Sequence, residues 1–314
     1  MPFLSEALED GEVAAFVDSN PQRWGERFEG YEIVAPESIR GLEWDEIVIS
    51  CTATVEVYKY LRRLGIPASR IRAAVASDRN RQRWDEMRNA HRQERIFIVG
   101  NGPSLRISDL ERIGRNQELS FGFNKIYLAF DQTEYRPTFY LVEDNLVARN
   151  CREQIKGLTG FTKFYADYLI PVLGPPDEES ILFNFSVQEP ETFSPKFSTE
   201  PLLIHSGYTC TYSAIQLALW MGCNPIILVG VDFWFRPAES DSAGRLVHSG
   251  EQNHFLPNYR QEGEIWNPPY LEQTERAYAL ARDVAAERGV EILNATRGGY
   301  LETFVRVGFD DLFV

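Results

Sequence analysis

Short apolar runs alternate with amphipathic stretches along most of this 314-residue chain. One such stretch, residues 272–288, carries apolar residues at helical spacing and is followed by Gly289, a common helix stop. Strands that alternate with helices build a parallel sheet with helices packed on its faces. The sequence therefore predicts an α/β fold with a Rossmann-like, doubly wound, mostly parallel sheet. Its strands are expected at residues 95–100, 119–123, 138–142, 225–230 and 290–293.

The length of the chain favours two domains, because single hydrophobic cores stop growing at about 250–300 residues. Residues 1–80 are predicted to form a small, incomplete Rossmann-like α/β domain. Its Asp18 follows a predicted strand and is a candidate ribose ligand, but no glycine-rich fingerprint precedes it, so a scaffold role is favoured. Residues 81–94 are polar and are predicted to form a linker helix. Residues 95–314 are predicted to form the second domain.

Two segments of the second domain lack a regular period of hydrophobic residues. Residues 171–203 are rich in Pro, Phe, Ser and Glu, and we expect a long irregular insertion there. Residues 236–269 are polar and are predicted to form a long loop.

The composition is that of a folded, acidic protein, with 44% hydrophobic residues and a formal net charge of −14. This charge disfavours nucleic acid as a partner, because phosphates bind clustered Lys and Arg. The four cysteines have no CxxC spacing and lie at no ligand spacing from a histidine, so we expect reduced thiols and no zinc site. The N-terminus lacks signal-peptide features, and no run of about 18 apolar residues occurs. A cytoplasmic location is expected.

Polar side chains follow the ends of five predicted strands. In a doubly wound sheet, ligands bind outside the carboxyl ends of the strands. We therefore expect a binding site along that edge of the sheet. The residues concerned are Asn101, Asn124, Asp144, Asp232 and Asn294.

The strand that ends at Gly100 runs into the turn Asn101-Gly102-Pro103-Ser104. Small residues let a ligand approach the backbone, and proline suits the first turn of a helix, expected here over residues 104–113. The free N–H groups and the dipole of that helix would favour an anion, so a nucleotide is the predicted ligand. The alternative is a tight strand-to-helix turn in which Ser104 is only a cap.

Several motifs carry a family resemblance. Val-Gly-Asn-Gly-Pro-Ser-Leu (99–105) resembles the opening motif of the bacterial sialyltransferases of glycosyltransferase family 42. It is also similar to a wider MptE-like group, named after archaeal 6-hydroxymethylpterin pyrophosphokinases. Further matches follow in order over about residues 95–314. They are Phe-Gly-Phe-Asn (121–124), Ser-Gly-Tyr-Thr-Cys-Thr (206–211), the strand that ends at Val-Asp-Phe (231–233) and Gln-Asn-His-Phe (252–255).

The resemblance implies a GT-A-like sialyltransferase variant of the fold and an inverting, metal-independent glycosyltransferase. Its donor would be a CMP-activated acidic sugar, sialic acid-like or Kdo-like, used in surface polysaccharide or glycan biosynthesis. His254 takes the place of the family's general base, since a histidine near neutrality can accept the proton of an acceptor hydroxyl. Trp234 stands where the family has a phosphate-binding tyrosine and Leu203 where it has an arginine, so the sugar stays open.

The predicted site has two further sets of residues. The nucleotide-binding set is Gly100, Asn101, Gly102, Pro103, Ser104, Asn124, Asp144, Ser206, Gly207, Asp232, Phe233 and Trp234. The substrate-binding set is Glu143, Asn253 and Arg297.

Two alternatives stay open at this point. Under the MptE-like resemblance, Glu143, Asp144 and Asp232 would hold Mg²⁺ in an ATP-dependent pyrophosphokinase. The other alternative is a non-catalytic, nucleotide-binding assembly module. The leading hypothesis needs no resident cofactor or metal, and its partners are a nucleotide-sugar donor and a glycan acceptor. Peripheral association with a membrane, a polysaccharide-assembly complex and a homo-oligomer are also left open.

Overall fold

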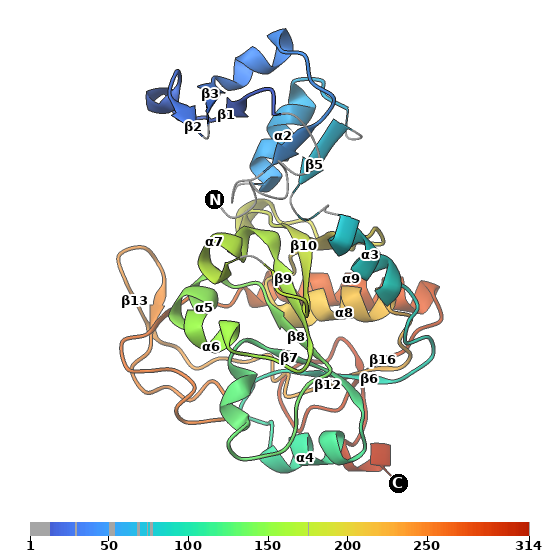
Figure 1. The fold of residues 1–314 in the computed structure, drawn as a ribbon. Coiled ribbons are helices and arrows are strands. Elements are labelled where there is room, and N and C mark those ends of the chain that lie inside the picture. The colour runs from blue at the N-terminus through green and yellow to red at the C-terminus, as the bar shows by residue number, and fades with distance from the viewer. Residues whose placement is uncertain are drawn as a thin grey trace. The chain divides into compact units, whose positions relative to one another are not determined.

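A computed structural model describes residues 13–28, 30–49, 54–67, 70–73, 75, 78–174 and 176–313. The chain divides into two compact units, Met1–Ser77 and Asp78–Val314 (Figure 1). The segment expected as a linker, residues 81–94, belongs to the second unit. It contains most of helix α3 (Asp78–Met87).

The described part of the first unit contains two small sheets. Strands β1 (Phe16–Val17), β3 (Tyr31–Val34) and β2 (Arg27–Phe28) lie in that order, the first pair parallel and the second antiparallel. Strands β4 (Ile47–Ile49) and β5 (Ile71–Ala73) form a parallel pair next to helix α2 (Thr54–Arg63). Short 3-10 helices, η1 (Pro21–Arg23) and η2 (Pro36–Gly41), complete the described part of this unit.

The carboxylate of Asp18 binds groups within its own turn. One carboxylate oxygen accepts a hydrogen bond from the Asn20 amide at 2.9 Å, and the other binds Arg23 Nη1 at 2.6 Å. Both oxygens therefore stabilise the turn that leads into η1, which favours the scaffold interpretation of this unit.

The second unit is built on a nine-stranded sheet in which every neighbouring pair is parallel. The strand order is β11-β10-β9-β8-β7-β6-β12-β16-β17. The central strands are continuous apolar runs because helices cover both faces, and every residue of β6 and β12 is buried. The predicted α/β, Rossmann-like class is thus confirmed. The strands are β6 (Ile96–Val99), β7 (Leu119–Phe123), β8 (Phe139–Val142), β9 (Thr162–Ala166), β10 (Ser180–Ser186), β11 (Leu203–His205), β12 (Ile226–Val229), β16 (Ile292–Asn294) and β17 (Val305–Arg306).

Helices flank the sheet on both sides. Helix α8 (Cys210–Trp220) packs against β6, β8 and α9 (Leu271–Glu287), and α4 (Ile107–Arg115) lies on the opposite side (Figure 1). Most of α8 is buried because it is enclosed by the sheet and α9. No described helix is long and apolar enough to cross a membrane. The remaining helices are α5 (Asn145–Asn150), α6 (Arg152–Lys156), α7 (Ile170–Leu173), η5 (Asn124–Ala129), η6 (Asp167–Leu169), η7 (Pro190–Thr192) and η8 (Asp310–Phe313).

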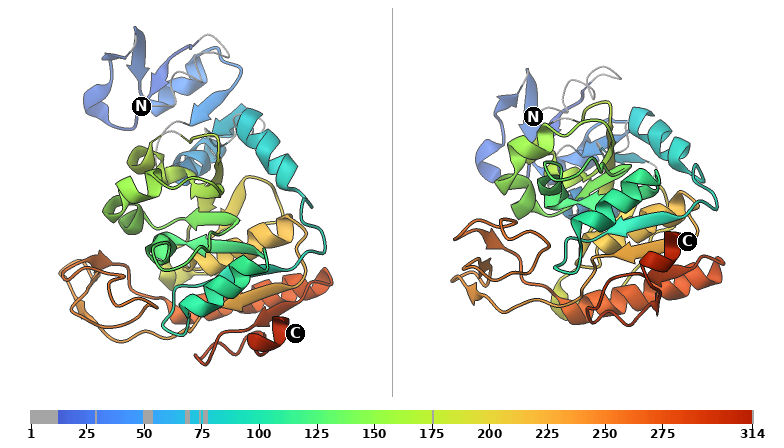
Figure 2. Two further views of the ribbon diagram at one scale, coloured as in Figure 1. Left: turned by 60° about the horizontal axis from the view of Figure 1, so that its bottom comes forward. Right: turned by 90° about the horizontal axis from the view of Figure 1, so that it is seen from below.

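Three sequence-based expectations were wrong. The segment 171–203 is not an irregular insertion, because β10 pairs with β9 and β11 inside the main sheet. The segment 236–269 contains a three-stranded antiparallel sheet of β13 (Glu239–Ser240), β14 (Leu246–Val247) and β15 (Ile265–Trp266), drawn in orange in both views of Figure 2. Helix α4 begins at Ile107 rather than at Ser104, because the turn before it is held by a neighbouring loop.

The strand order fixes where a ligand site is expected. From β6 the chain adds β7 to β11 in succession on one side, and then returns through α8 to place β12 on the other side of β6. The direction of winding therefore switches between β6 and β12. Open α/β sheets bind ligands outside the carboxyl ends of the strands at such a switch point.

Candidate functional site at the carboxyl edge of the sheet

The turn after β6 touches the turn after β12 through backbone contacts. The Gly100 amide donates to the Val229 carbonyl at 2.7 Å, and the Gly102 amide donates to the Gly230 carbonyl at 2.9 Å. A Cβ atom on Gly102 would lie 2.7 Å from the Gly230 oxygen and would also overlap the Asp232 carboxylate. Glycine at these positions thus serves the close approach of two chain segments at the switch point.

Asp232 ties the two turns together. Its Oδ2 accepts hydrogen bonds from Ser104 Oγ at 2.8 Å and from the Ser104 amide at 3.3 Å. Burial raises the pKa of Asp232, and the two bonds from Ser104 oppose that rise. Pro103 and Ser104 therefore lie in a turn before α4, and the helix N-terminus expected at Ser104 lies three residues further on.

Asn101 follows Gly100 and has one unused polar atom. Its Nδ2 donates to the Phe123 carbonyl and to Tyr259 Oη, both at 3.0 Å. Its Oδ1 is buried and has no hydrogen-bond partner among the described residues. Buried acceptors are nearly always paired in folded proteins, which makes this unpaired oxygen a candidate acceptor for a donor on a ligand.

Asn124, at the end of β7, occupies a left-handed backbone conformation with φ of 48°. Asparagine tolerates this region better than most residues. Its carbonyl accepts a hydrogen bond from Tyr140 Oη at 2.6 Å, and its side-chain oxygen lies 3.8 Å from the sulfur of Cys210, the first residue of α8. The end of β7 is thus in contact with α8, the helix that follows the serine–glycine segment Ser206-Gly207.

His254 is brought to the same place by Tyr259. The two rings are stacked with centroids 3.8 Å apart and planes 3° apart, and the hydroxyl of Tyr259 contacts Asn101. The Phe255 amide also donates to the Asn101 carbonyl at 3.0 Å. The His254 residue as a whole is intermediate in exposure. The structure thereby brings together the predicted base and the predicted nucleotide turn.

The surroundings of His254 favour the neutral form of its imidazole. Burial lowers its pKa well below 6.5, and the nearby positive charges of Arg260, Lys125 and His248 lower it further. A neutral ring carries a free lone pair, which is the form required of a proton acceptor.

Lys125 was missed by the sequence reasoning. It is 6% exposed, and its Nζ binds both oxygens of Glu264 at 2.6 and 2.7 Å and the Tyr259 carbonyl at 2.9 Å. These contacts hold the 236–269 segment against η5 and so fix Tyr259 and His254. A single lysine inside the apolar run 121–130 was the only signal in the sequence for this role.

The two acids after β8 have different environments. Asp144 caps α5, accepting from the amides of Leu146 at 2.7 Å and Val147 at 3.0 Å, and it also accepts from Asn267 at 3.0 Å. Glu143 is 6% exposed, and its Oε2 has no partner within the described part of the chain. Burial raises the pKa of Glu143 to about 7. Of these two acids, only Glu143 keeps an unpaired oxygen.

The serine–glycine segment shapes the entry to α8. Ser206 Oγ accepts from the Tyr208 amide at 3.2 Å, and Gly207 packs so closely on Tyr212 that a Cβ atom would lie 2.8 Å from the Cβ of that tyrosine. Thr209 caps the helix by accepting from the Thr211 amide. Ser206 and Gly207 thus have local structural roles at this edge.

The two residues after Asp232 contact aromatic side chains from later parts of the chain. Phe233, with φ of 56°, packs on Tyr278 at a centroid distance of 6.0 Å. Trp234 is 41% exposed, and its ring lies 6.5 Å from that of Tyr300.

Two predicted substrate ligands are engaged by protein groups. The Asn253 amide group accepts from the Arg236 amide at 2.6 Å and donates to the Arg236 carbonyl at 3.2 Å. Arg297 pairs with Asp109 at 3.1 Å and with Asp310 at 2.9 Å. We interpret both as structural residues, because their polar atoms are already used.

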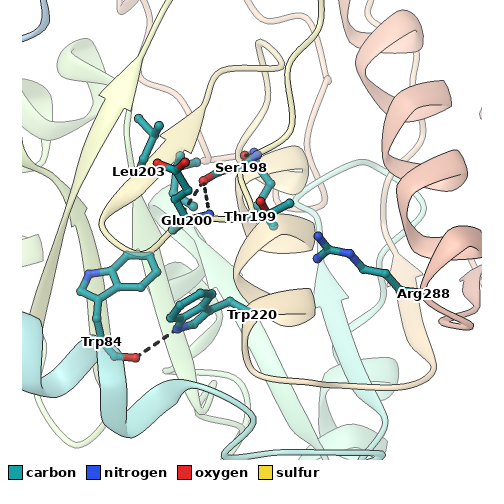
Figure 3. A pocket seen from close by; sticks show the side chains of 9 residues that line it. Trp84, Ser198, Thr199, Glu200, Leu203, Trp220 and Arg288 are labelled. Carbon is teal, nitrogen blue, oxygen red and sulfur yellow. Dashed lines mark hydrogen bonds between the residues drawn. The ribbon is translucent and has the colours of Figure 1, made fainter.

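The described residues include no cluster of three His, Cys, Asp or Glu side chains able to hold a metal ion. A separate small pocket lies at the opposite end of the sheet, near the start of β11 and the end of α8 (Figure 3). It is distant in the fold from the strand ends described above. It is lined by Trp84, Ser198, Thr199, Glu200, Leu203, Ile204, Gln216, Trp220 and Arg288.

Comparison with known proteins gives two family matches. Residues 75–237 match the family described as 6-hydroxymethylpterin diphosphokinase MptE-like, and residues 4–72 match one described as C2185-like, N-terminal. The MptE-like match confirms the resemblance over β6 to β12, and it ends before His254. No curated protein matches the chain.

Two solved structures show distant similarity in fold. A glycosyltransferase, MAf, from Magnetospirillum magneticum AMB-1 is 17% identical with a TM-score of 0.46, over 83% of this chain and 48% of that one. The present chain thus spans about half the length of that protein. A mammalian sialyltransferase in complex with Gal-beta-1-3GalNAc-ortho-nitrophenol is 12% identical with a TM-score of 0.31, over 82% of this chain and 92% of that one.

Proposed function

The chain belongs to the 6-hydroxymethylpterin diphosphokinase MptE-like family, and from that premise we propose that it is a transferase that binds a nucleotide between the ends of β6 and β12. The group transferred is an acidic sugar, sialic acid-like or Kdo-like, carried on CMP. The acceptor is a glycan, the anomeric centre is inverted, and the reaction needs no metal.

The observation that carries this proposal is the arrangement around Tyr259. Its ring stacks on His254 and its hydroxyl contacts Asn101, so one residue holds a proton acceptor beside an unpaired, buried oxygen at the switch point. A base next to a nucleotide site is what transfer to a hydroxyl requires.

The chemical step follows from these roles. The acceptor hydroxyl oxygen attacks the anomeric carbon, and the bond from that carbon to the CMP phosphate oxygen breaks. The electron pair leaves with CMP, and the hydroxyl proton passes to a ring nitrogen of His254. Stabilisation of the developing charge on the phosphate without a metal would require protein donors around it.

The family description favours a second candidate, a Mg²⁺-dependent pyrophosphokinase that moves the diphosphate of ATP to a hydroxyl. Glu143, with its unpaired Oε2, is the acid best suited to receive the metal. Asp144 and Asp232 already accept hydrogen bonds from α5 and from Ser104, which supports the metal-independent proposal over this one.

An activity assay separates the candidates. The protein is mixed with CMP-sialic acid or CMP-Kdo and an oligosaccharide acceptor in EDTA, and in parallel with ATP, Mg²⁺ and 6-hydroxymethylpterin. We expect CMP release that saturates with donor and is unaffected by EDTA. AMP formation that requires Mg²⁺, with no CMP release, would replace this proposal by the pyrophosphokinase. No product in either assay would favour the non-catalytic, nucleotide-binding assembly module.

A further inference from the structure

Arg260 is a buried cation with few partners. Its side chain is 11% exposed, and its one ion pair among the described residues is with Glu264, 3.8 Å from Nη1. The Nε–H has no acceptor in that part of the chain. A buried guanidinium normally has charge-assisted hydrogen bonds, because its desolvation is costly.

The carboxylate of Glu264, beside Arg260, already has other hydrogen-bond partners. Both oxygens of Glu264 bind Lys125, and one also accepts from the Gln261 amide at 3.0 Å. Two buried cations therefore share one carboxylate, which leaves a positive charge uncompensated at short range.

Other acids near Arg260 have partners of their own. Asp144 caps α5 and accepts from Asn267. Glu251 binds His248 at 3.0 Å and accepts from the Ser249 amide at 2.9 Å. Both charges favour the charged form of Arg260, but neither carboxylate accepts a hydrogen bond from its guanidinium or lies within ion-pair distance of it.

A second unused donor lies beside the guanidinium. Arg260 sits over the ring of Trp266, with its Cζ 4.3 Å from the ring centroid. Trp266 is 4% exposed, and no described residue accepts a hydrogen bond from its Nε1. Two adjacent buried donors without acceptors form a site suited to an anion.

We propose that Arg260 binds an anionic group of the substrate, a phosphate or a carboxylate oxyanion, with the Trp266 indole as a second donor. This inference rests on the proposed function for the identity of the substrate. Arg260 directly follows Tyr259, on which His254 stacks, so the bound anion lies beside the proposed base. Both the donor phosphate and the carboxylate of an acidic sugar have the required chemistry.

The test compares Arg260→Met with wild type and with Arg245→Met, a control in the same segment whose arginine pairs with Asp241 near the surface. Calorimetry measures the affinities for cytidine, CMP and CMP-sialic acid. Loss of a charge-assisted contact weakens binding by roughly 10- to 100-fold. A loss for CMP but not for cytidine identifies the phosphate. The carboxylate is identified if Arg260→Met leaves the affinity for CMP unchanged and removes only the additional affinity that CMP-sialic acid has over CMP.

Thermal shifts with inorganic phosphate and with acetate keep this inference separate from the proposed function. If no cytidine ligand binds the wild type, the proposed function fails. The anion site then stands if phosphate or acetate stabilises the wild type and Arg245→Met but not Arg260→Met. Equal responses of Arg260→Met and wild type to every ligand, or no response of the wild type to any of them, would overturn the anion site.

Discussion

Replacing His254 by phenylalanine is expected to lower the rate of CMP release about 10²- to 10⁴-fold, the usual contribution of a general base. Phenylalanine keeps an aromatic ring against Tyr259, where the present rings stack at 3.8 Å, and it removes both nitrogens. The affinity for CMP should therefore change little. Steady-state kinetics and calorimetry on the same samples measure both quantities.

The pH dependence gives an independent readout of this role. Burial, with the charges of Arg260, Lys125 and His248, holds the pKa of His254 well below 6.5, so the free enzyme should keep its base unprotonated above that pH. We expect kcat/KM to lose no activity through His254 between pH 6.5 and 8. His91→Gln, a control that removes a histidine remote from the carboxyl edge, should behave as wild type. Full turnover by the His254→Phe variant would remove His254 from the mechanism.

Replacing Glu143 by glutamine is expected to stabilise the protein at alkaline pH by about 3 kcal/mol. Burial raises the pKa of Glu143 from 4.5 to about 7, so the folded state holds its proton over a range in which the unfolded state has released it. Stability should therefore fall as pH rises from about 4.5 to 7 and stay low above that. Glutamine cannot ionise, so the variant loses this part of the pH dependence.

Urea unfolding between pH 4.5 and 8.5 measures this effect. Glu153, which is 77% exposed, provides the matched control, and Glu153→Gln should follow the wild-type curve. If the free energy of unfolding of Glu143→Gln and of wild type depended on pH in the same way, ionisation of Glu143 would not destabilise the folded protein, which would contradict this prediction.

Much of the sheet was predictable because its strands are continuous apolar runs. Strand β7 was predicted to the residue, and β6, β8, β12 and β16 to within a few residues. Strand β10 was not predicted, because Ser and Asn interrupt its apolar residues and proline-rich segments flank it. Its burial comes from β9 and β11, which are partners that no local pattern reveals.

The candidate site was predictable where it depends on strand ends. Asn101, Asn124 and Asp232 follow β6, β7 and β12 as expected, because parallel strands bring their carboxyl ends to one edge. The roles of Tyr259 and Arg260 depend on how the 236–269 segment folds over that edge, and periodicity carries no such information. The ion pair between Arg297 and Asp109 could not be predicted for the same reason, because the two residues lie far apart in the sequence.

The central claim is that a nucleotide binds at the switch point between β6 and β12, where the Oδ1 of Asn101 is unpaired. The measurement that tests it most directly is calorimetric titration of CMP into wild type and Asn101→Leu, a variant of similar shape without the amide. The exposed Asn116→Leu serves as control. We predict CMP binding by wild type and by the control, and a loss of roughly tenfold or more for Asn101→Leu. Equal affinities for wild type and Asn101→Leu would contradict this placement of the nucleotide.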